Sequence, residues 1–308
     1  MSLRSAMPAS IRSRPLVAEI GVVVGLLAGI SVWRRVLTAL QPRLVEAVPD
    51  GMGDPVGGFL VGGAFLVGLV LYAGVYARLR GVAVGLSLPS SADRRHLGMA
   101  AVVPLGLVAL TKLAGVLTGV PYNALTMSAY GADTPPTAFL SLVGPGLVVA
   151  AICLAIVCQV LVQGTFQRVA GGRSAIALTT ALTAVVLTSA TGGVTPTPHW
   201  GKLLGAVAFV CSLGVALYAI DHVDRGWMQY LAYVPVTSVV GLVVISWIAE
   251  TGTVAELLFG ATHVAVLALA AAGYERTESL LVPAVAYLSL LVGNEAVVFV
   301  FEAGMQSW

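Results

Sequence analysis

Long apolar stretches separated by short polar connections make up most of the chain. Nine of these stretches have about the 20 residues that a helix needs to cross a bilayer. They cover residues 15–32, 56–75, 97–120, 147–169, 174–194, 203–220, 227–248, 254–272 and 279–301. The pattern predicts an all-α, polytopic membrane helix bundle with about eight or nine transmembrane helices.

Composition excludes a water-soluble protein. Of 308 residues, 58% are apolar and 10% are charged, whereas soluble domains carry about 25% charged residues. The net charge is only +2, and no basic cluster is denser than Arg94-Arg95-His96. The chain therefore lacks the electrostatic footprint of a nucleic-acid-binding protein, and the lipid bilayer is its predicted partner.

Basic residues predict the orientation. Assigning alternate connections to opposite sides puts eleven arginines on one side and Arg34, Arg35, Arg43 and Lys202 on the other. The positive-inside rule then predicts a plasma-membrane protein with a cytoplasmic N-terminus and an external C-terminus. The first apolar stretch leads into Trp33 without a cleavage pattern, so we expect a retained anchor rather than a signal peptide. The eleven are Arg4, Arg12, Arg14, Arg78, Arg80, Arg94, Arg95, Arg168, Arg173, Arg225 and Arg276.

Two connections on the outer side, 34–55 and 121–137, are too long to be simple turns. Gly144-Pro145-Gly146 predicts a helix break, because proline removes a backbone donor and glycine relaxes the backbone. We therefore expect a short outer helix or re-entrant piece before a true span that starts near Leu147.

Cysteines and other ligand residues predict no cofactor and no metal site. Cys153, Cys158 and Cys211 lie inside apolar stretches, without the spacing of a disulfide framework or a zinc site. We expect all three to be small core residues.

Residues 76–240 carry an order of features that resembles the CPBP family of intramembrane endopeptidases, which includes CAAX prenyl proteases and bacteriocin self-immunity proteins. The resemblance rests on Arg80-Gly81, the segment 84–89, the polar stretch 121–137, and the segment 158–168, which reads CQVLVQGTFQR. Gly164 and Gln167 match the family's main motif. The resemblance divides the chain into N-terminal helices (1–75), a CPBP-like core (76–240) and C-terminal helices (241–308).

The family's catalytic residue types are absent at the matching positions. Its adjacent glutamates correspond to Cys158 and Gln159, and its arginine corresponds to Gln163. Its two histidine positions correspond to Thr191 and Pro235. Since the family's glutamates and histidines activate a water molecule, and a glutamine cannot accept a proton near neutral pH, the resemblance implies a scaffold without the chemistry. Such a protein would bind a membrane peptide or a lipidated protein, or confer self-immunity.

The same stretch is also compatible with ordinary helix packing, in which Gly164 and neighbouring threonines let helices approach closely. Two other functions stay open. Lys112, Glu256, His263 and Glu295 form a candidate intramembrane polar site, typical of transporters or channels. An active protease would have to use His222 and His263.

Lys112 and Glu295 have opposite charges at similar predicted depths, each about six residues from the outer end of its span. We expect them to form an ion pair, with Glu256 as the alternative acid. Otherwise Lys112 would extend its side chain to the interface.

Overall fold

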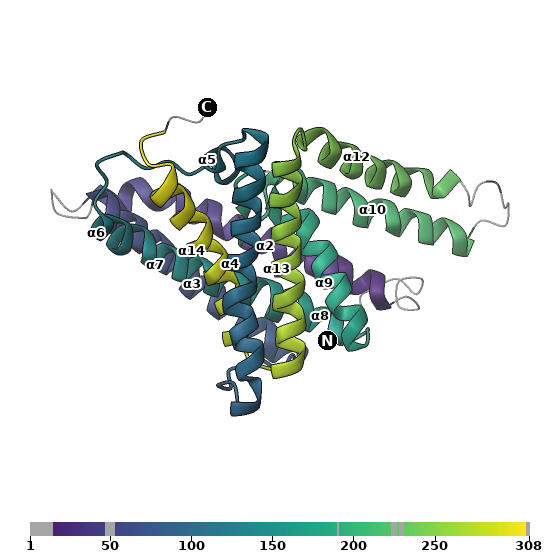
Figure 1. The fold of residues 1–308 in the computed structure, drawn as a ribbon. Coiled ribbons are helices and arrows are strands. Elements are labelled where there is room, and N and C mark those ends of the chain that lie inside the picture. Colours follow the sequence, from purple (N-terminus) through teal and green to yellow (C-terminus); the bar gives the residue numbers. More distant parts are fainter. Residues whose placement is uncertain (1–14, 47–52, 190, 223–226, 228–230, 306–308) are drawn as a thin grey trace.

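The computed structural model describes residues 15–46, 53–189, 191–222, 227 and 231–305 (Figure 1). These ranges are almost entirely helical, so the predicted all-α class is confirmed. The longer helices are α2 (Pro15–Glu46), α3 (Gly53–Arg80), α4 (Arg94–Thr118), α7 (Gly144–Ala155), α9 (Gly172–Leu187), α10 (Trp200–His222), α12 (Val234–Glu250), α13 (Val254–Thr277) and α14 (Leu281–Phe301). The short elements are η2 (Ser91–Asp93), α5 (Tyr122–Thr126), α6 (Pro136–Ala138), η3 (Phe139–Val143), η4 (Ile156–Gln163), α8 (Gly164–Gln167), β1 (Thr188–Ser189) and β2 (Gly193–Val194).

Seven helical segments in the described part are long and apolar enough to cross a membrane. Two further apolar helices, Gly172–Leu187 and Val234–Trp247, are shorter. Large apolar side chains such as Leu71, Val102 and Leu117 are exposed on the helix surfaces. Extensive exposed apolar surface is unfavourable in water and is typical of a surface that contacts a membrane. The chain is thus a multi-pass membrane protein whose outer surface contacts the lipid bilayer.

Helices α4, α13 and α14 pack against one another at the centre of the molecule, with α7 against α14 (Figure 1). The buried core joins distant parts of the chain, since Leu27 of α2, Leu161 of η4, Leu267 of α13 and Leu290 of α14 are all essentially inaccessible. This shared core holds the N-terminal, middle and C-terminal helices in one bundle.

Helices α10 and α12 pack together as a hairpin that extends away from α13 in Figure 1, and α10 also packs on α2. The hairpin surface is apolar and exposed, including Leu242 and Ile245 of α12. Cys211 lies on this surface. The expectation that all three cysteines are core residues is therefore wrong for Cys211, although Cys153 and Cys158 are buried.

Several connections meet at one end of the bundle. Leu86 forms an isolated antiparallel bridge with Ser279, and Gly172 lies directly against the side chain of Glu275. At the same end, Arg80 at the end of α3 forms a buried ion pair with Glu19 in the first turns of α2. Seven of the eleven arginines assigned to the cytoplasmic side lie at or next to these connections.

Other described connections meet at the opposite end. The amide of Gly192 donates to the carbonyl of Leu125 (2.7 Å), and the amide of Gly304 donates to the carbonyl of Tyr130 (2.8 Å). Arg34 donates a hydrogen bond to the Thr197 hydroxyl. Within the described ranges, these two groups of connections thus lie at opposite ends of the bundle.

The predicted break at Gly144-Pro145-Gly146 is wrong. Helical structure continues from Pro136 to Gln167 and changes its winding instead. Pro145 lies in the first turn of α7, directly after the wide π-helical turn of η3. A proline's missing donor is tolerated in a first helical turn, so no interruption is needed.

The predicted span 174–194 is wrong in its last third. Helix α9 ends at Leu187, and the chain then forms an antiparallel hairpin in which Thr188 pairs with Val194 and Ser189 with Gly193. Gly192 and Gly193 have φ angles of 81° and 75°, a conformation that glycine adopts without steric cost. The glycine pair therefore turns the chain back before the apolar run ends.

The predicted outer connection 34–55 is largely helical, because α2 continues to Glu46. One of its basic residues contacts the start of α10: the Arg35 guanidinium lies 4.0 Å from the centre of the Trp200 ring. This cation–π contact, with the Arg34 hydrogen bond, ties α2 to the start of α10.

Candidate functional site

The segment 158–168 begins in a π-helix, η4 (Ile156–Gln163), and continues through α8 (Gly164–Gln167). All eight residues of η4 are buried. π-helical turns are rare and often mark functional positions. The wider winding places Cys158, Gln159 and Gln163 in contact with other helices. These three residues, which the sequence resemblance singled out, are all fully buried inside the protein.

Gln159 is held by the last helix. Its amide nitrogen donates to the Tyr287 hydroxyl of α14 at 3.2 Å, and both side chains are buried. The Gln159 amide oxygen is buried without a partner among the described residues. Tyr287 thus connects this part of η4 to α14.

Gln163 is held by α13. Its amide nitrogen donates to the Ala271 carbonyl at 3.0 Å and to the Glu275 carboxylate at 3.3 Å. Glu275 also accepts a hydrogen bond from Gln167. The Gln163 amide oxygen is buried and, within the described ranges, has no partner.

Thr191 and Pro235 do not join this cluster. Thr191 is exposed in the turn between β1 and β2, and Pro235 is exposed in the first turn of α12. Helix α9 ends four residues before Thr191, so Thr191 does not lie on a helix beside Gln159. His222, the other histidine weighed for catalysis, has its side chain outside the described residues.

The cluster consists of groups that exchange hydrogen bonds. Gln159 and Gln163 contribute amides, which cannot accept a proton near neutral pH, and Cys158 contributes a buried thiol. The carboxylate of Glu275 accepts amide hydrogen bonds from Gln163 and Gln167. What remains is a connection of η4 and α8 to α13 and α14.

Lys112 pairs with a different acid from the one predicted. Its ammonium forms an ion pair with Glu302, directly after α14, and not with Glu295 or Glu256. The same carboxylate accepts hydrogen bonds from the backbone amides of Tyr122 (2.8 Å) and Asn123 (2.6 Å). Burial raises the pKa of Glu302, but these bonds outweigh burial and the pKa is lowered overall.

Glu295 anchors the outer connection. Its carboxylate accepts hydrogen bonds from the hydroxyls of Ser128 (2.8 Å) and Tyr130 (2.7 Å). Burial, followed by the hydrogen bond to Glu295, raises the pKa of Tyr130. Glu295 of α14 and Glu302, directly after α14, thus both hold segment 121–130.

Glu256 caps a helix. Its amide donates to the Thr253 hydroxyl (3.2 Å), and its carboxylate accepts from the Thr253 amide (2.9 Å). This reciprocal capping box satisfies donors at the first turn of α13. The location at a helix start explains an acidic residue here without any transport role.

His263 belongs to a buried hydrogen-bonded chain in the centre of the bundle. Its Nδ1 lies 2.7 Å from the Phe259 carbonyl, which assigns the proton to Nδ1 and makes Nε2 an acceptor. The Asn294 amide nitrogen lies 3.4 Å from that Nε2, and the Asn294 oxygen accepts from the Tyr122 hydroxyl at 2.8 Å. The chain links α13, α14 and the short outer helix α5.

The four residues proposed as an intramembrane polar site therefore form separate contacts. Sequence reasoning missed Tyr122, Asn294 and Glu302, which complete the contacts of Lys112 and His263, and Tyr287, which holds Gln159. Asn294 had a usable signal, since a buried amide in an apolar span needs hydrogen-bonding partners.

No family model matches the chain, and neither a curated protein nor a solved structure matches it. Within the described ranges, no group of three or more His, Cys, Asp and Glu side chains could hold a metal ion.

Proposed function

We propose that this protein is a non-catalytic binding protein of the membrane, built on a helix bundle that resembles the CPBP endopeptidases. Its partner would be a membrane peptide or a lipidated protein, in a role such as self-immunity. The observation that carries the proposal is the packing of Gln159 and Gln163, both completely buried and hydrogen-bonded to neighbouring helices.

The contacts of these glutamines favour a structural role. Gln159 donates to Tyr287 and Gln163 donates to the Ala271 carbonyl, so each side chain joins η4 to a C-terminal helix. A hydrolytic centre needs a proton acceptor beside an accessible substrate carbonyl. Uncharged side chains with no exposed surface are better suited to holding helices together.

Transport is the second candidate function, because the polar residues that suggested it are held in contacts of their own. Lys112, Glu256 and Glu295 each contact groups near helix ends, and His263 is bonded to its own helix. A transport cycle that broke these contacts would be costly, because each broken contact leaves a polar group unpaired.

Photo-crosslinking tests binding directly. Full-length protein in lipid nanodiscs is mixed with a farnesylated peptide that carries a photoreactive residue, and the same peptide without the prenyl group is the control. We expect saturable crosslinking that farnesylated peptide without the photoreactive residue competes away. The peptide that is not crosslinked should keep its full mass, since the proposed function includes no cleavage. Labelling that does not saturate, or that is equal for the unprenylated peptide, would contradict the proposal.

A further inference from the structure

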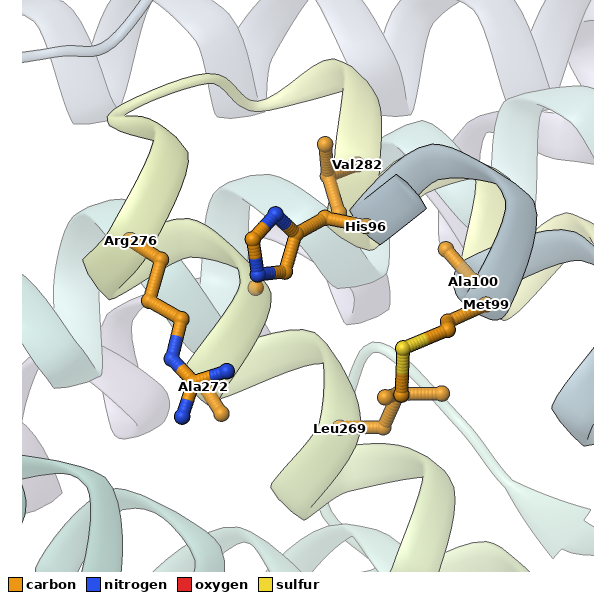
Figure 2. Close-up of a pocket in the computed structure, with 8 residues that line it drawn as sticks. His96, Met99, Ala100, Leu269, Ala272, Arg276 and Val282 are labelled. Carbon is orange, nitrogen blue, oxygen red and sulfur yellow. The ribbon is translucent and has the colours of Figure 1, made fainter. Parts of the chain in front are cut away.

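A pocket lies between the beginning of α4 and the end of α13, and it differs from the glutamine cluster described above. It encloses about 40 Å³, and Figure 2 shows its lining side chains coming from both helices and from the start of α14. Its place in the bundle is the end where the arginine-rich connections meet. The lining residues are His96, Met99, Ala100, Leu269, Ala272, Gly273, Arg276 and Val282.

Small residues create the hollow. Ala100 on α4 faces Ala272 and Gly273 on α13, so little side-chain volume fills the seam between the two helices. A Cβ added at Gly273 would lie 2.8 Å from a Val282 methyl group, which makes that wall of the pocket tightly packed. Met99 and Leu269 extend the apolar lining along the seam (Figure 2).

Two nitrogen-bearing side chains border the same pocket. His96 comes from the first turn of α4 and Arg276 from the last turn of α13, and Figure 2 shows both beside the hollow. Arg276 is exposed and forms no ion pair with any described carboxylate. The Nδ1 of His96 is buried and, in the described part of the chain, has no hydrogen-bond partner. Arg94 and Arg95 add positive charge in the same first turn of α4.

An apolar hollow bordered by basic side chains favours a ligand with an apolar part and an anionic group. A pocket of this size cannot enclose a drug-sized molecule, which needs about 300 Å³ or more. A ligand must therefore insert only a part of itself and remain mostly outside. A lipid does so: its phosphate can meet basic side chains at the membrane surface while an acyl chain lies along an apolar seam between helices.

We propose that this pocket binds an anionic phospholipid, with the phosphate at His96 and Arg276 and an acyl chain along Met99 and Leu269. The site goes beyond the proposed binding function and does not depend on it. It lies on the side that the positive-inside rule predicts to be cytoplasmic, where anionic lipids attract basic residues.

Native mass spectrometry of the full-length protein in detergent tests the site. The probes are phosphatidylglycerol, phosphatidylcholine with the same acyl chains, and glycerol phosphate as the free anion. We expect phosphatidylglycerol to bind at least about fivefold more tightly than phosphatidylcholine, and Arg276→Gln to remove most of that preference. Ala272→Leu, which fills the apolar seam and keeps both basic groups, should also weaken phosphatidylglycerol binding.

Arg173→Gln is the matched control, since it removes an exposed arginine at the same end but outside the pocket. It should change the affinity by less than about twofold, and Arg276→Lys should retain most of the binding. Equal losses for Arg173→Gln and Arg276→Gln would assign binding to general surface charge and overturn the proposal. Competition by glycerol phosphate as strong as that of the lipid would also overturn it, in favour of a free-anion site. Thermal unfolding of each variant separates loss of binding from loss of the fold.

Discussion

Lys112 in the last two turns of α4 and Glu302 just beyond α14 form an ion pair that closes one end of the bundle. Glu302 is almost completely buried, and its carboxylate also accepts the amides of Tyr122 and Asn123. One side chain therefore joins α4, the start of α5 and the C-terminal helix. A buried carboxylate with several charge-assisted hydrogen bonds is costly to leave partly unpaired.

A double-mutant cycle tests this pair. Lys112→Met and Glu302→Gln should each destabilise the detergent-solubilised protein, and together they should cost less than the sum, with a coupling of about 1–2 kcal/mol. Thermal unfolding measures all four proteins. The cycle of Lys112→Met with Glu295→Gln is the matched control and should be additive. Coupling in the control cycle but not in the Glu302 cycle would contradict the assignment.

The stability that Glu302 contributes should depend on pH. Its pKa is lowered in the folded protein, so the contribution is fully present above the unfolded pKa of about 4.3 and is lost as pH falls through the lower folded value. The difference in Tm between the protein and Glu302→Gln should therefore be constant near neutrality and shrink in acid. A difference that instead disappears as pH rises would have the wrong sign.

Gly193 should not tolerate a side chain. Its φ is 75°, and an added Cβ would lie 2.6 Å from the Nε2 of His263. Gly193→Ala should destabilise by about 1–3 kcal/mol, from backbone strain and from the clash with the buried His263 chain. The control is Gly171→Ala, where φ is −66° and a Cβ meets open space. Equal Tm values for the two variants would refute this account of the hairpin.

Cysteine accessibility tests the predicted orientation. In a Cys211→Ser background, Ser91→Cys should resist a membrane-impermeant maleimide applied to intact cells, while Asp133→Cys should react. Ser91 begins η2, which directly precedes α4, and Asp133 lies in the connection that follows α4. Both residues are exposed. The excess of arginine on the Ser91 side supports this direction. External labelling of Ser91→Cys would reverse the topology.

Apolar length alone predicted the fold class and most of the spans, because a run of about 20 apolar residues has few alternatives. It failed at 188–194, where Thr, Val and Ala continue the apolar character although Gly192 and Gly193 turn the chain. The sequence could identify Lys112 as an intramembrane charge. It could not identify its partner, because Glu302 lies after the apolar run and joins the bundle only through the folding of segment 121–130.

The glutamine cluster was predictable in part. The spacing of Cys158, Gln159 and Gln163 within one apolar segment placed them together. Their partners, Tyr287 and the Ala271 carbonyl, lie more than 100 residues away in sequence, and only helix packing brings them close. The π-helical winding of η4 also has no simple sequence signal, since its residues are ordinary helix formers.

Peptide cleavage is the most direct test of the central claim that the scaffold lacks hydrolytic chemistry. Purified protein in nanodiscs is incubated with a prenylated peptide, with and without divalent metal, and the products are measured by mass spectrometry. We expect no cleavage, and none after Cys158→Glu with Gln159→Glu, because Thr191, which the proposed resemblance matches to a family histidine, has no imidazole and lies exposed in the turn between β1 and β2. Cleavage by the unmodified protein that Gln159→Ala abolishes would contradict the account.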